Sequence, residues 1–388
     1  MTTRLRCFVA EPDSGLRAFV VVDSLVGGRA MGGTRMAEDV TVEEVAELAR
    51  KMTLKLALAE IPIGGAKAGI LHEGGDDRER DRVLAAFGHC VAPLLHGGVY
   101  LGTDQGIAHR DRDFFFAAAG FDVRMEACAC AVPCTWEDLW GRCDQVAGFG
   151  VCEALDAAVE ILGLRDRCRT VAIQGFGVVG RAVATGLTER GFAVTAVADR
   201  EGTIAARGAL PLEALLEATD AHGTIDRRLL PDGLERSSTP EAWLDVDADV
   251  LVLAAGTASV NERNVDRVRA SVVVEAGNIA CSEAANRTLR ERGVLVLPDI
   301  LVNVGSAALT GLALTGAPPP ELELDPLVDW LFTEIAARIR RNVAHVVDRA
   351  GSTASLTEVA NAIATERAGR MAAAEPRPAE LAVTLPGA

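Results

Sequence analysis

No run of apolar residues in this sequence is long enough to cross a membrane. The longest uncharged stretch, residues 300–320, contains Asn303, three glycines and three consecutive prolines, which do not suit a spanning helix. The first residues, Met-Thr-Thr-Arg-Leu-Arg-Cys, show neither the apolar core nor the cleavage pattern of a secretory signal. We therefore expect a cytoplasmic protein without a membrane partner.

Positive charge is also scarce. The chain has 39 lysines and arginines against 55 aspartates and glutamates, a formal net charge of −16. A surface of this kind repels nucleic acids and anionic membranes, so neither is expected as a partner. An anionic small molecule would have to be bound by individual cationic side chains.

The nine cysteines lack the paired Cys-x2-Cys spacing of a structural zinc site. An odd number of cysteines without an export signal favours reduced thiols. We expect the thiols to pack as small core side chains, and we predict no metal site. Five of them lie in one region: Cys128, Cys130, Cys134, Cys143 and Cys152.

Two lysines lie where a lysine that merely contacts solvent is unusual. Thr41 and Glu44 form the Thr-x-x-Glu pattern that opens a helix, and Lys55 continues the apolar stripe of that helix. Lys67 follows two glycines and has small neighbours, which allow a backbone or a ligand to approach closely. A buried ammonium needs an anion, and burial lowers its pKa toward values useful in proton transfer. The two lysines predict a site that binds a carboxylate and transfers protons; the alternative is a pair whose charged ends reach solvent.

A dinucleotide-binding pattern occupies the middle of the chain. Residues 170–174 read as a short strand, Gly-x-Gly-x-x-Gly follows at 175–180, and helical spacing continues to Arg190. A second apolar strand ends in Asp199, 19 residues after Gly180 (199 − 180). In this pattern the glycines let a pyrophosphate approach a helix N-terminus, and the acid accepts hydrogen bonds from the adenosine ribose. The alternative is a tight turn between strand and helix that binds no nucleotide.

Asp199 predicts NAD as the coenzyme, because its charge would repel a 2′-phosphate. Arg200 leaves NADP as the alternative, since a guanidinium could pair with that phosphate. We expect the turn to contribute Gly175, Phe176, Gly177, Val178, Val179 and Gly180 to the coenzyme site.

The order of elements predicts an α/β fold with two domains. Strands near 170–174, 193–198, 249–253, 271–275 and 294–297 alternate with helical stretches, which indicates a parallel, Rossmann-type sheet with helices on both faces. Before this unit, strands at 17–22, 67–71 and 98–102 mix with helices. We place the first domain at 1–145 and the dinucleotide-binding domain at 146–339, with helices at about 340–373 packing back on the first domain and a disordered tail at 374–388.

Six ordered segments carry a resemblance to a known family. They are Gly32-Gly33-Thr34-Arg35; Met52-Thr53-Leu54-Lys55 with Gly64-Gly65-Ala66-Lys67; Asp104 within 100–106; the turn at 174–180; Glu275-Ala276-Gly277-Asn278; and Pro298-Asp299 followed by Asn303 and Gly305. From about Arg17 to Arg370 the chain resembles the superfamily of glutamate, leucine, phenylalanine and valine dehydrogenases.

The resemblance implies reversible oxidative deamination of an L-amino acid to its 2-oxo acid and ammonia. It implies that Lys55 binds the α-carboxylate, Lys67 activates water, Asp104 carries protons to and from nitrogen, and Asn303 positions the amino acid. It also implies a cleft between the domains that closes on the substrate, and a homo-oligomer. Further residues implied on the substrate side are Met31, Gly32, Gly33 and Thr310, and on the coenzyme side Ala254, Ala255, Asn278 and Asn303.

Position 31 bears on the choice of substrate. Glutamate enzymes of the family carry a lysine before Gly-Gly-x-Arg, whereas leucine and phenylalanine enzymes carry an apolar residue, and this chain has Met31. A thioether cannot neutralise a carboxylate, so we expect an apolar substrate such as leucine, valine or phenylalanine. Met31 as plain core packing is the alternative. Thr310 stands in the place of a serine that helps glutamate enzymes, so glutamate dehydrogenase activity is an alternative function for this chain.

Two departures from the family pattern keep other functions open. Ala147 replaces a threonine that would hold the nicotinamide carboxamide, and Gly28-Arg29 replaces Gly-Pro. A catalytically weakened, nucleotide-binding homologue with a regulatory role is therefore one alternative. A 2-hydroxy-acid dehydrogenase is less favoured, because it needs a histidine and arginine pair, and none of the 6 histidines lies in such a motif.

Overall fold

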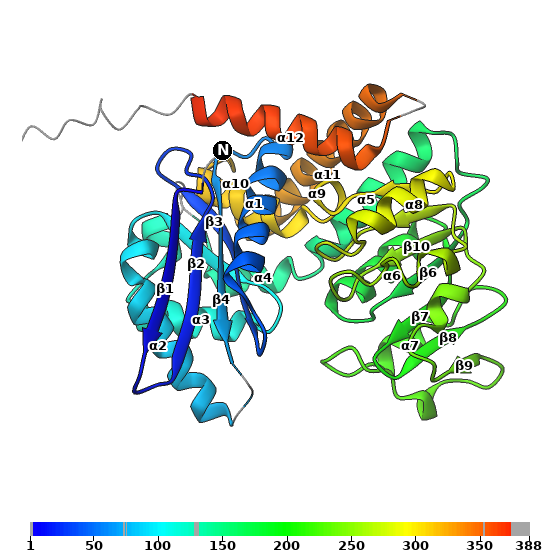
Figure 1. The fold of residues 1–388 in the computed structure, drawn as a ribbon, viewed down its shortest axis with the longest axis horizontal. Coiled ribbons are helices and arrows are strands. Elements are labelled where there is room, and N and C mark those ends of the chain that lie inside the picture. The colour runs from blue at the N-terminus through cyan, green and yellow to red at the C-terminus, as the bar shows by residue number, and fades with distance from the viewer. Residues whose placement is uncertain (1–2, 73, 75, 128–131, 352–353, 374–388) are drawn as a thin grey trace, which may run out of the picture. The chain divides into compact units, whose positions relative to one another are not determined.

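The computed structural model describes residues 3–72, 74, 76–127, 132–351 and 354–373, which form two compact units (Figure 1). Unit 1 comprises the described residues of 1–139, 310–327 and 363–388; unit 2 comprises those of 140–309 and 328–362. Cys128, Cys130 and the expected tail at 374–388 lie outside the described residues. The predicted α/β class is confirmed, while the predicted domain boundaries stay a prediction.

Unit 1 is built on a five-stranded sheet in the order β1-β2-β4-β3-β5. The strands are β1 (Leu5–Glu11), β2 (Leu16–Val22), β3 (Ala30–Ala37), β4 (Gly64–Leu71) and β5 (Val99–Thr103). β3 runs parallel to both β4 and β5, whereas β2 is antiparallel to β1 and β4. The Gly-Gly-Thr-Arg segment therefore lies in a strand that is paired on both edges and buried along nearly its whole length.

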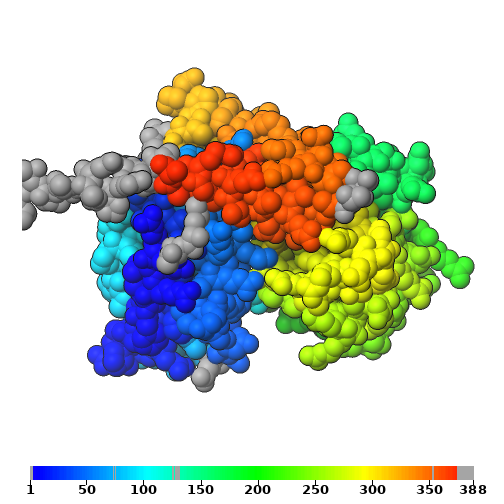
Figure 2. Space-filling view, turned by 45° about the horizontal axis from the view of Figure 1, so that its top comes forward, coloured from blue at the N-terminus to red at the C-terminus, as the bar shows by residue number. Residues whose placement is uncertain are grey.

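Helices cover both faces of this sheet. α1 (Val42–Leu58) packs on one face, where Val21 of β2 meets Val45 and Ala49 of the helix. α2 (Asp77–His96) contacts β1, β2 and β5, and α3 (His109–Ala119) packs on α2 and β5. The edge strand β1 alternates half-buried and exposed residues, and Figure 2 shows it in dark blue at the surface of unit 1.

α1 begins as its sequence predicts. The hydroxyl of Thr41 accepts a hydrogen bond from the backbone N–H of Glu44 at 3.2 Å, which satisfies one of the donors that a helix start leaves open. The cap fixes where the helix starts and hence which side chains face the sheet. Lys55, in the last turn, is only 5% exposed.

Unit 2 contains a seven-stranded sheet in the order β12-β11-β10-β6-β7-β8-β9. The strands are β6 (Thr170–Gln174), β7 (Ala193–Asp199), β8 (Gly202–Ala205), β9 (Glu235–Ser237), β10 (Val250–Leu253), β11 (Val272–Val274) and β12 (Leu295–Leu297). The five strands predicted from the sequence are parallel, and β8 and β9 add an antiparallel edge. The chain passes from β6 to β7 on one side of β6, and it later returns from β9 to place β10 on the other side of β6. This reversal is where open α/β sheets bind ligands.

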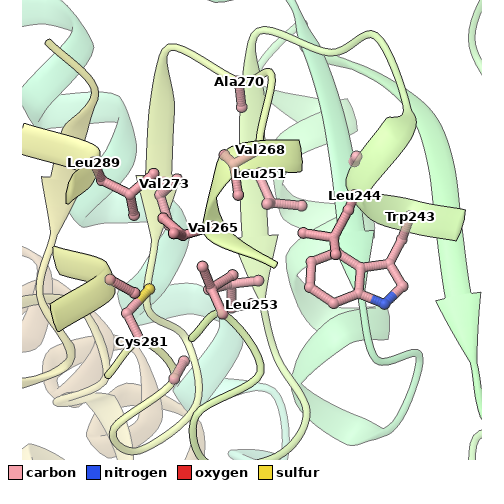
Figure 3. Close-up of a cluster of buried hydrophobic side chains, with 14 of the residues drawn as sticks. Trp243, Leu244, Leu251, Leu253, Val265, Val268, Ala270, Val273, Cys281 and Leu289 are labelled. Carbon is pink, nitrogen blue, oxygen red and sulfur yellow. The ribbon is translucent and has the colours of Figure 1, made fainter. Parts of the chain in front are cut away.

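The core of unit 2 forms where inward-facing strand residues meet helical segments. Leu251, Leu253 and Val273 pack with Trp243 and other buried residues (Figure 3). Burying one such side chain contributes roughly 1.5–3 kcal/mol, so this cluster fixes the strand ends that carry the loops above them.

The helices of the second half of the chain have the following bounds: α5 (Val146–Ile161), α6 (Val178–Glu189), α7 (Leu212–Glu217), α8 (Glu283–Glu291), α9 (Asp299–Val302), α10 (Gly305–Thr315), α11 (Leu324–Ala350) and α12 (Leu356–Ala373). Residues of α11 and α12 from 328 to 362 group with unit 2, and those from 363 onward with unit 1. Among the described residues, no helix is both long and apolar enough to cross a membrane.

Candidate functional site

A buried hydroxyl and carboxylate network holds the two lysine-bearing segments of unit 1 together. Thr53 of α1 donates to Asp23 Oδ2 at 2.6 Å, and its Oγ1 lies 2.9 Å from the hydroxyl of Ser24. The same Ser24 Oγ accepts the backbone N–H of Gly65 at 3.1 Å. These contacts tie α1 to the start of β4, two residues before Lys67.

Glycine is required at position 65 by this packing. A Cβ built there would lie 2.3 Å from the backbone nitrogen of Thr53 and 2.5 Å from the carbonyl oxygen of Ala49. The absence of a side chain lets the helix lie directly on the strand. Lys67 shares a strand face with Gly65, because residues two apart in a strand point to the same side. Lys67 therefore points toward the face that α1 covers.

Lys67 and Asp104, predicted as the catalytic pair, are in contact. Lys67 Nζ lies 3.2 Å from Asp104 Oδ2, and the lysine side chain is 4% exposed. Arg35 Nε donates to the same oxygen at 3.0 Å, and Arg35 Nη1 contacts Glu44 Oε1 at 2.5 Å. Two cations thus face one aspartate, and the Thr-x-x-Glu cap of α1 supplies the second carboxylate.

The electrostatics keep Asp104 ionised. Burial alone would raise the pKa of its carboxyl, but the charges of Lys67 and Arg35 and their hydrogen bonds outweigh burial, so the pKa lies below its ordinary value of 3.8. The resting pair is consequently a carboxylate beside a cationic cluster.

The Gly-Gly pair of β3 has a structural reason. A Cβ on Gly32 would lie 1.7 Å from the carbonyl oxygen of Ala66, and one on Gly33 would lie 2.9 Å from Asp104 Cβ. The glycines let β4 and the residue after β5 approach β3, which brings Asp104 to Lys67. Direct contact of either glycine with substrate stays a prediction.

Met31 lies on the same strand face as Lys67. Met31 of β3 is in register with Gly65 of β4 and with Tyr100 of β5. Residues in register point to the same face of a sheet, so the Met31 side chain lies on the face of Gly65 and Tyr100. Met31 is 3% exposed. Tyr100 accepts a hydrogen bond from Trp136 Nε1 at 3.2 Å, and its ring packs edge-on near Phe116. The register partners of Met31 are therefore a glycine and a tyrosine, neither of which is charged.

The remaining substrate-side predictions fall in both units. Lys55 is buried on α1, the helix that covers the Lys67 face. Thr310, 3% exposed, belongs to unit 1 together with Gly311, whose absent Cβ would lie 2.6 Å from Ile61. Asn303 follows α9 in unit 2, where its backbone N–H donates to Asp299 at 2.9 Å.

The Gly-x-Gly-x-x-Gly turn of unit 2 has the shape that a dinucleotide requires. Gly175 has φ +94°, and a Cβ on Gly180 would lie 1.9 Å from the carbonyl oxygen of Gly175, so the turn closes only with glycines. Gly177 has open space where its Cβ would be and begins α6 without a side-chain cap. Open space at a helix start whose N–H groups lack side-chain partners suits a pyrophosphate. The residues fit a dinucleotide coenzyme.

The other coenzyme-side predictions gather at the carboxyl ends of the same strands. Phe176 is buried, and Val178 is 56% exposed. The N–H of Ala254 donates to the Gln174 carbonyl at 2.7 Å, and Ala255 lies against Gly175. The loop that carries Asn278 follows β11, where Gly277 donates to Leu253 at 2.7 Å. Val179 lies one residue before Gly180 in the first turn of α6.

Asp199 ends β7 as predicted, but its carboxylate already has protein partners. Arg227 donates from Nη2 to Oδ1 and from Nη1 to Oδ2, both at 2.5 Å. The neighbouring Arg200 donates from Nε to Thr224 Oγ1 at 2.7 Å. The predicted bond from Asp199 to a ribose stays a prediction that now faces a competing partner.

The two departures from the family pattern lie in defined packing. Ala147 is in the first turn of α5 and lies against Gly305: a Cβ on Gly305 would be 3.3 Å from the Cα of Ala147. Arg29 stands where the family has proline: its backbone N–H donates to the Val26 carbonyl at 3.0 Å, a bond that proline cannot make, and its Nη1 donates to the Leu314 carbonyl at 2.5 Å.

Three of the five cysteines that lie close together in the sequence, Cys134, Cys143 and Cys152, are among the described residues and are at least partly buried. Cys143 and Cys152 are buried, and Cys134 is half-buried. Burial raises the pKa of the Cys152 thiol to about 12, which makes it unreactive.

Sequence reasoning assigned no role to Arg35, Asp23 or Arg227. Arg35 had a signal, because it belongs to the Gly-Gly-x-Arg segment. Asp23 and Ser24 follow an apolar strand, and their contact with Thr53 depends on tertiary packing. Arg227 lies 28 residues after Asp199, in a connection that no pattern links to it.

Comparisons with known proteins agree with this arrangement. A family model described as "Glu/Leu/Phe/Val dehydrogenase, dimerisation domain" matches residues 4–112, and one described as "Glutamate/Leucine/Phenylalanine/Valine dehydrogenase" matches residues 142–375. The chain is 32% identical over 300 residues to a glutamate dehydrogenase of Thermotoga maritima, covering 75% of this chain and 70% of that protein. It is also 32% identical over 343 residues to an NADP(+)-dependent glutamate dehydrogenase of Pyrobaculum calidifontis, covering 83% and 77%.

Solved structures show the same similarity. The hetero-hexameric glutamate dehydrogenase from Thermus thermophilus, in a form described as Leu-bound, is 27% identical with a TM-score of 0.76. The match covers 95% of this chain and 88% of that chain. An L-tryptophan dehydrogenase from Nostoc punctiforme, 21% identical with a TM-score of 0.64, shares the fold.

Proposed function

We propose a reaction for this chain from one premise: the chain belongs to the glutamate/leucine/phenylalanine/valine dehydrogenase family, whose members are NAD(P)-dependent amino acid dehydrogenases. The proposed reaction is the reversible oxidative deamination of an L-amino acid with an apolar side chain to its 2-oxo acid and ammonia. The observation that carries the chemistry is the contact of 3.2 Å between Lys67 Nζ and Asp104 Oδ2.

The pair can perform the proton transfers that the reaction needs. A bound nicotinamide would supply the acceptor for the hydride that leaves the substrate Cα, and the substrate would then be an iminium. The ionised Asp104 can take a proton from the substrate ammonium before the hydride leaves, and it can return that proton to the nitrogen that departs as ammonia. Lys67, once its own proton has passed to solvent, can take the proton from the water that attacks the iminium carbon. The cationic cluster around Asp104 lets one proton move between carboxylate and amine over a short distance. Lys55 offers the charge for the substrate α-carboxylate.

The side-chain preference rests on position 31. Met31 lies on the Lys67 face beside Tyr100, and neither side chain can neutralise a second carboxylate. A glutamate side chain buried there would cost several kcal/mol unless it found another cation. We therefore propose leucine, valine, phenylalanine or a similar amino acid as the substrate.

Glutamate is the second candidate, and the names of the relatives favour it over an apolar amino acid. The two relatives named above at 32% identity are both glutamate dehydrogenases, and each match covers most of this chain. Thr310 is the residue of this chain that supports the candidate, because a hydroxyl can donate to a carboxylate.

Steady-state kinetics with a panel of L-amino acids separates the two candidates. We expect the wild-type kcat/KM for leucine to exceed that for glutamate by at least about 10², as expected when an unpaired buried charge costs several kcal/mol. Met31→Lys should narrow the ratio by raising activity with glutamate and lowering it with leucine. Met31→Leu, which keeps an apolar side chain of similar volume, is the matched control and should preserve the ratio. A wild-type preference for glutamate would reject the apolar assignment and leave the family chemistry intact.

Other parts of the proposal concern organisation. We propose that residues 1–145 bind the amino acid and residues 146–339 the coenzyme. Of the helices at about 340–373, which were expected to pack on the first domain, residues 340–362 group with unit 2 and residues 363–373 with unit 1. A homo-oligomer is proposed because a relative of similar structure is described as hetero-hexameric and the family model for residues 4–112 as a dimerisation domain. A cytoplasmic location is proposed because the buried cysteines Cys152 and Cys168 are free thiols.

A further inference from the structure

We propose that Arg227 sets the coenzyme preference of this chain by occupying Asp199, so that the chain binds NADPH at least as tightly as NADH. The proposal rests on the proposed use of a nicotinamide dinucleotide. It reverses the preference that Asp199 alone predicts.

The Asp199 carboxylate is saturated by hydrogen bonds within unit 2. Oδ1 accepts from Arg227 Nη2 at 2.5 Å and from the N–H of Glu201 at 2.8 Å. Oδ2 accepts from Arg227 Nη1 at 2.5 Å and from the N–H of Ile225 at 2.8 Å. A carboxylate offers about four acceptor positions, and all are in use. The Asp199 side chain is 2% exposed.

Two consequences follow for an adenosine ribose at the end of β7. Its hydroxyls meet a carboxylate that has no acceptor position left, so the usual gain from binding NAD is lost. In addition, the guanidinium offsets the charge of Asp199 in a paired, fork-like geometry, so a 2′-phosphate no longer meets an uncompensated anion. Both effects remove discrimination against NADP.

A cation remains available at the same strand end. Arg200 is exposed, and within the part of the chain that the structure describes its hydrogen bonding is limited to the Nε contact with Thr224. Its terminal nitrogens can therefore pair with a phosphate.

The loop that carries Thr224 and Arg227 lies against the coenzyme turn. A Cβ on Gly223 would lie 2.8 Å from Gly177 Cα, and Arg181 Nη1 donates to the Asp220 carbonyl at 3.2 Å. This packing holds Arg227 beside the position expected for the adenosine. It also holds Arg200 there, through the bond of Arg200 to Thr224.

Direct binding of NADH and NADPH to the purified full-length chain, followed by nucleotide fluorescence without amino acid, tests the proposal. We expect a wild-type Kd for NADPH equal to or below that for NADH. Arg227→Gln should shift the Kd ratio at least tenfold toward NADH, because Asp199 is released to bind ribose. Arg228→Gln is the matched control: Arg228 is adjacent, 88% exposed and paired with Asp226, and its loss should change the ratio less than twofold.

A second variant guards against misfolding of the first. Asp199→Asn should keep the Kd for NADH within threefold of the wild-type value if Asp199 takes no part in wild-type binding of the ribose. A wild-type preference for NADH of tenfold or more, or an NADH affinity that collapses in Asp199→Asn while the variant melts like the wild type, would overturn the role of Arg227. Absence of binding by either nucleotide to the folded wild type would overturn the proposed function as well.

Discussion

Replacing Asp104 by asparagine separates the chemistry of the Lys67 pair from its structural contribution. The substitution keeps the shape of the side chain but leaves Lys67, 4% exposed, without a carboxylate, while Arg35 retains Glu44 at 2.5 Å. Removing one partner of a buried ion pair costs about 3–5 kcal/mol, and the retained Arg35 contact places Asp104→Asn near the lower end. Loss of a positioned acid–base group should lower kcat by about 10² to 10⁴.

The pH dependence of stability gives an independent check. The folded pKa of Asp104 lies below its ordinary value of 3.8, so the ionised pair stabilises the fold above that pH and the contribution is lost as pH falls through the folded pKa. Asparagine has no such dependence. The difference in unfolding free energy between wild type and Asp104→Asn should therefore be constant from about pH 7 to 5 and narrow at more acidic pH.

Urea unfolding followed by circular dichroism and initial rates of coenzyme reduction measure the two effects. Asp111→Asn is the matched control, because Asp111 pairs with Arg80 at 2.7 Å in the same unit without contacting Lys67. It should lose stability but retain kcat. Equal activity of folded Asp104→Asn and wild type, or a stability difference that does not change in acid, would refute the reasoning.

Two further substitutions test parts of the site. Lys55→Ala should lower kcat/KM by about 10² mainly through KM, because the proposed charge for the α-carboxylate is lost, whereas Lys51→Ala in the same helix should not; unchanged KM in Lys55→Ala argues against that role. Gly65→Ala should destabilise unit 1 by several kcal/mol, since its Cβ would lie 2.3 Å from Thr53 N, whereas Gly369→Ala, with no neighbour within 4 Å, should be neutral or stabilising. Equal urea midpoints for the two alanine variants would show that α1 does not need a glycine beneath it.

Local patterns carried much of the fold. The Thr41 cap, the five parallel strands and the turn at Gly175 to Gly180 follow from short-range rules, and the structure has each of them. The edge strands β1 and β9 were not expected. β9 has three residues, and β1 alternates half-buried with exposed positions, so neither presents the apolar run that marks an interior strand.

The site was predictable only as far as residue identity. Lys67 and Asp104 could be named from their segments, but their contact depends on β3 lying between β4 and β5. The face on which Met31 lies depends likewise on its register with Gly65, which no local pattern specifies. Arg227 was missed because its pairing with Asp199 depends on the path of the chain between them, and no sequence motif relates two residues 28 positions apart in this way.

The most direct test of the central claim is the stoichiometry of the reaction catalysed by the purified chain. With an apolar L-amino acid and NAD or NADP, the account predicts equal amounts of reduced coenzyme, ammonia and 2-oxo acid, and none of the three with Lys67→Ala. A folded wild-type protein that binds coenzyme but reduces none of it with any L-amino acid would contradict the claim.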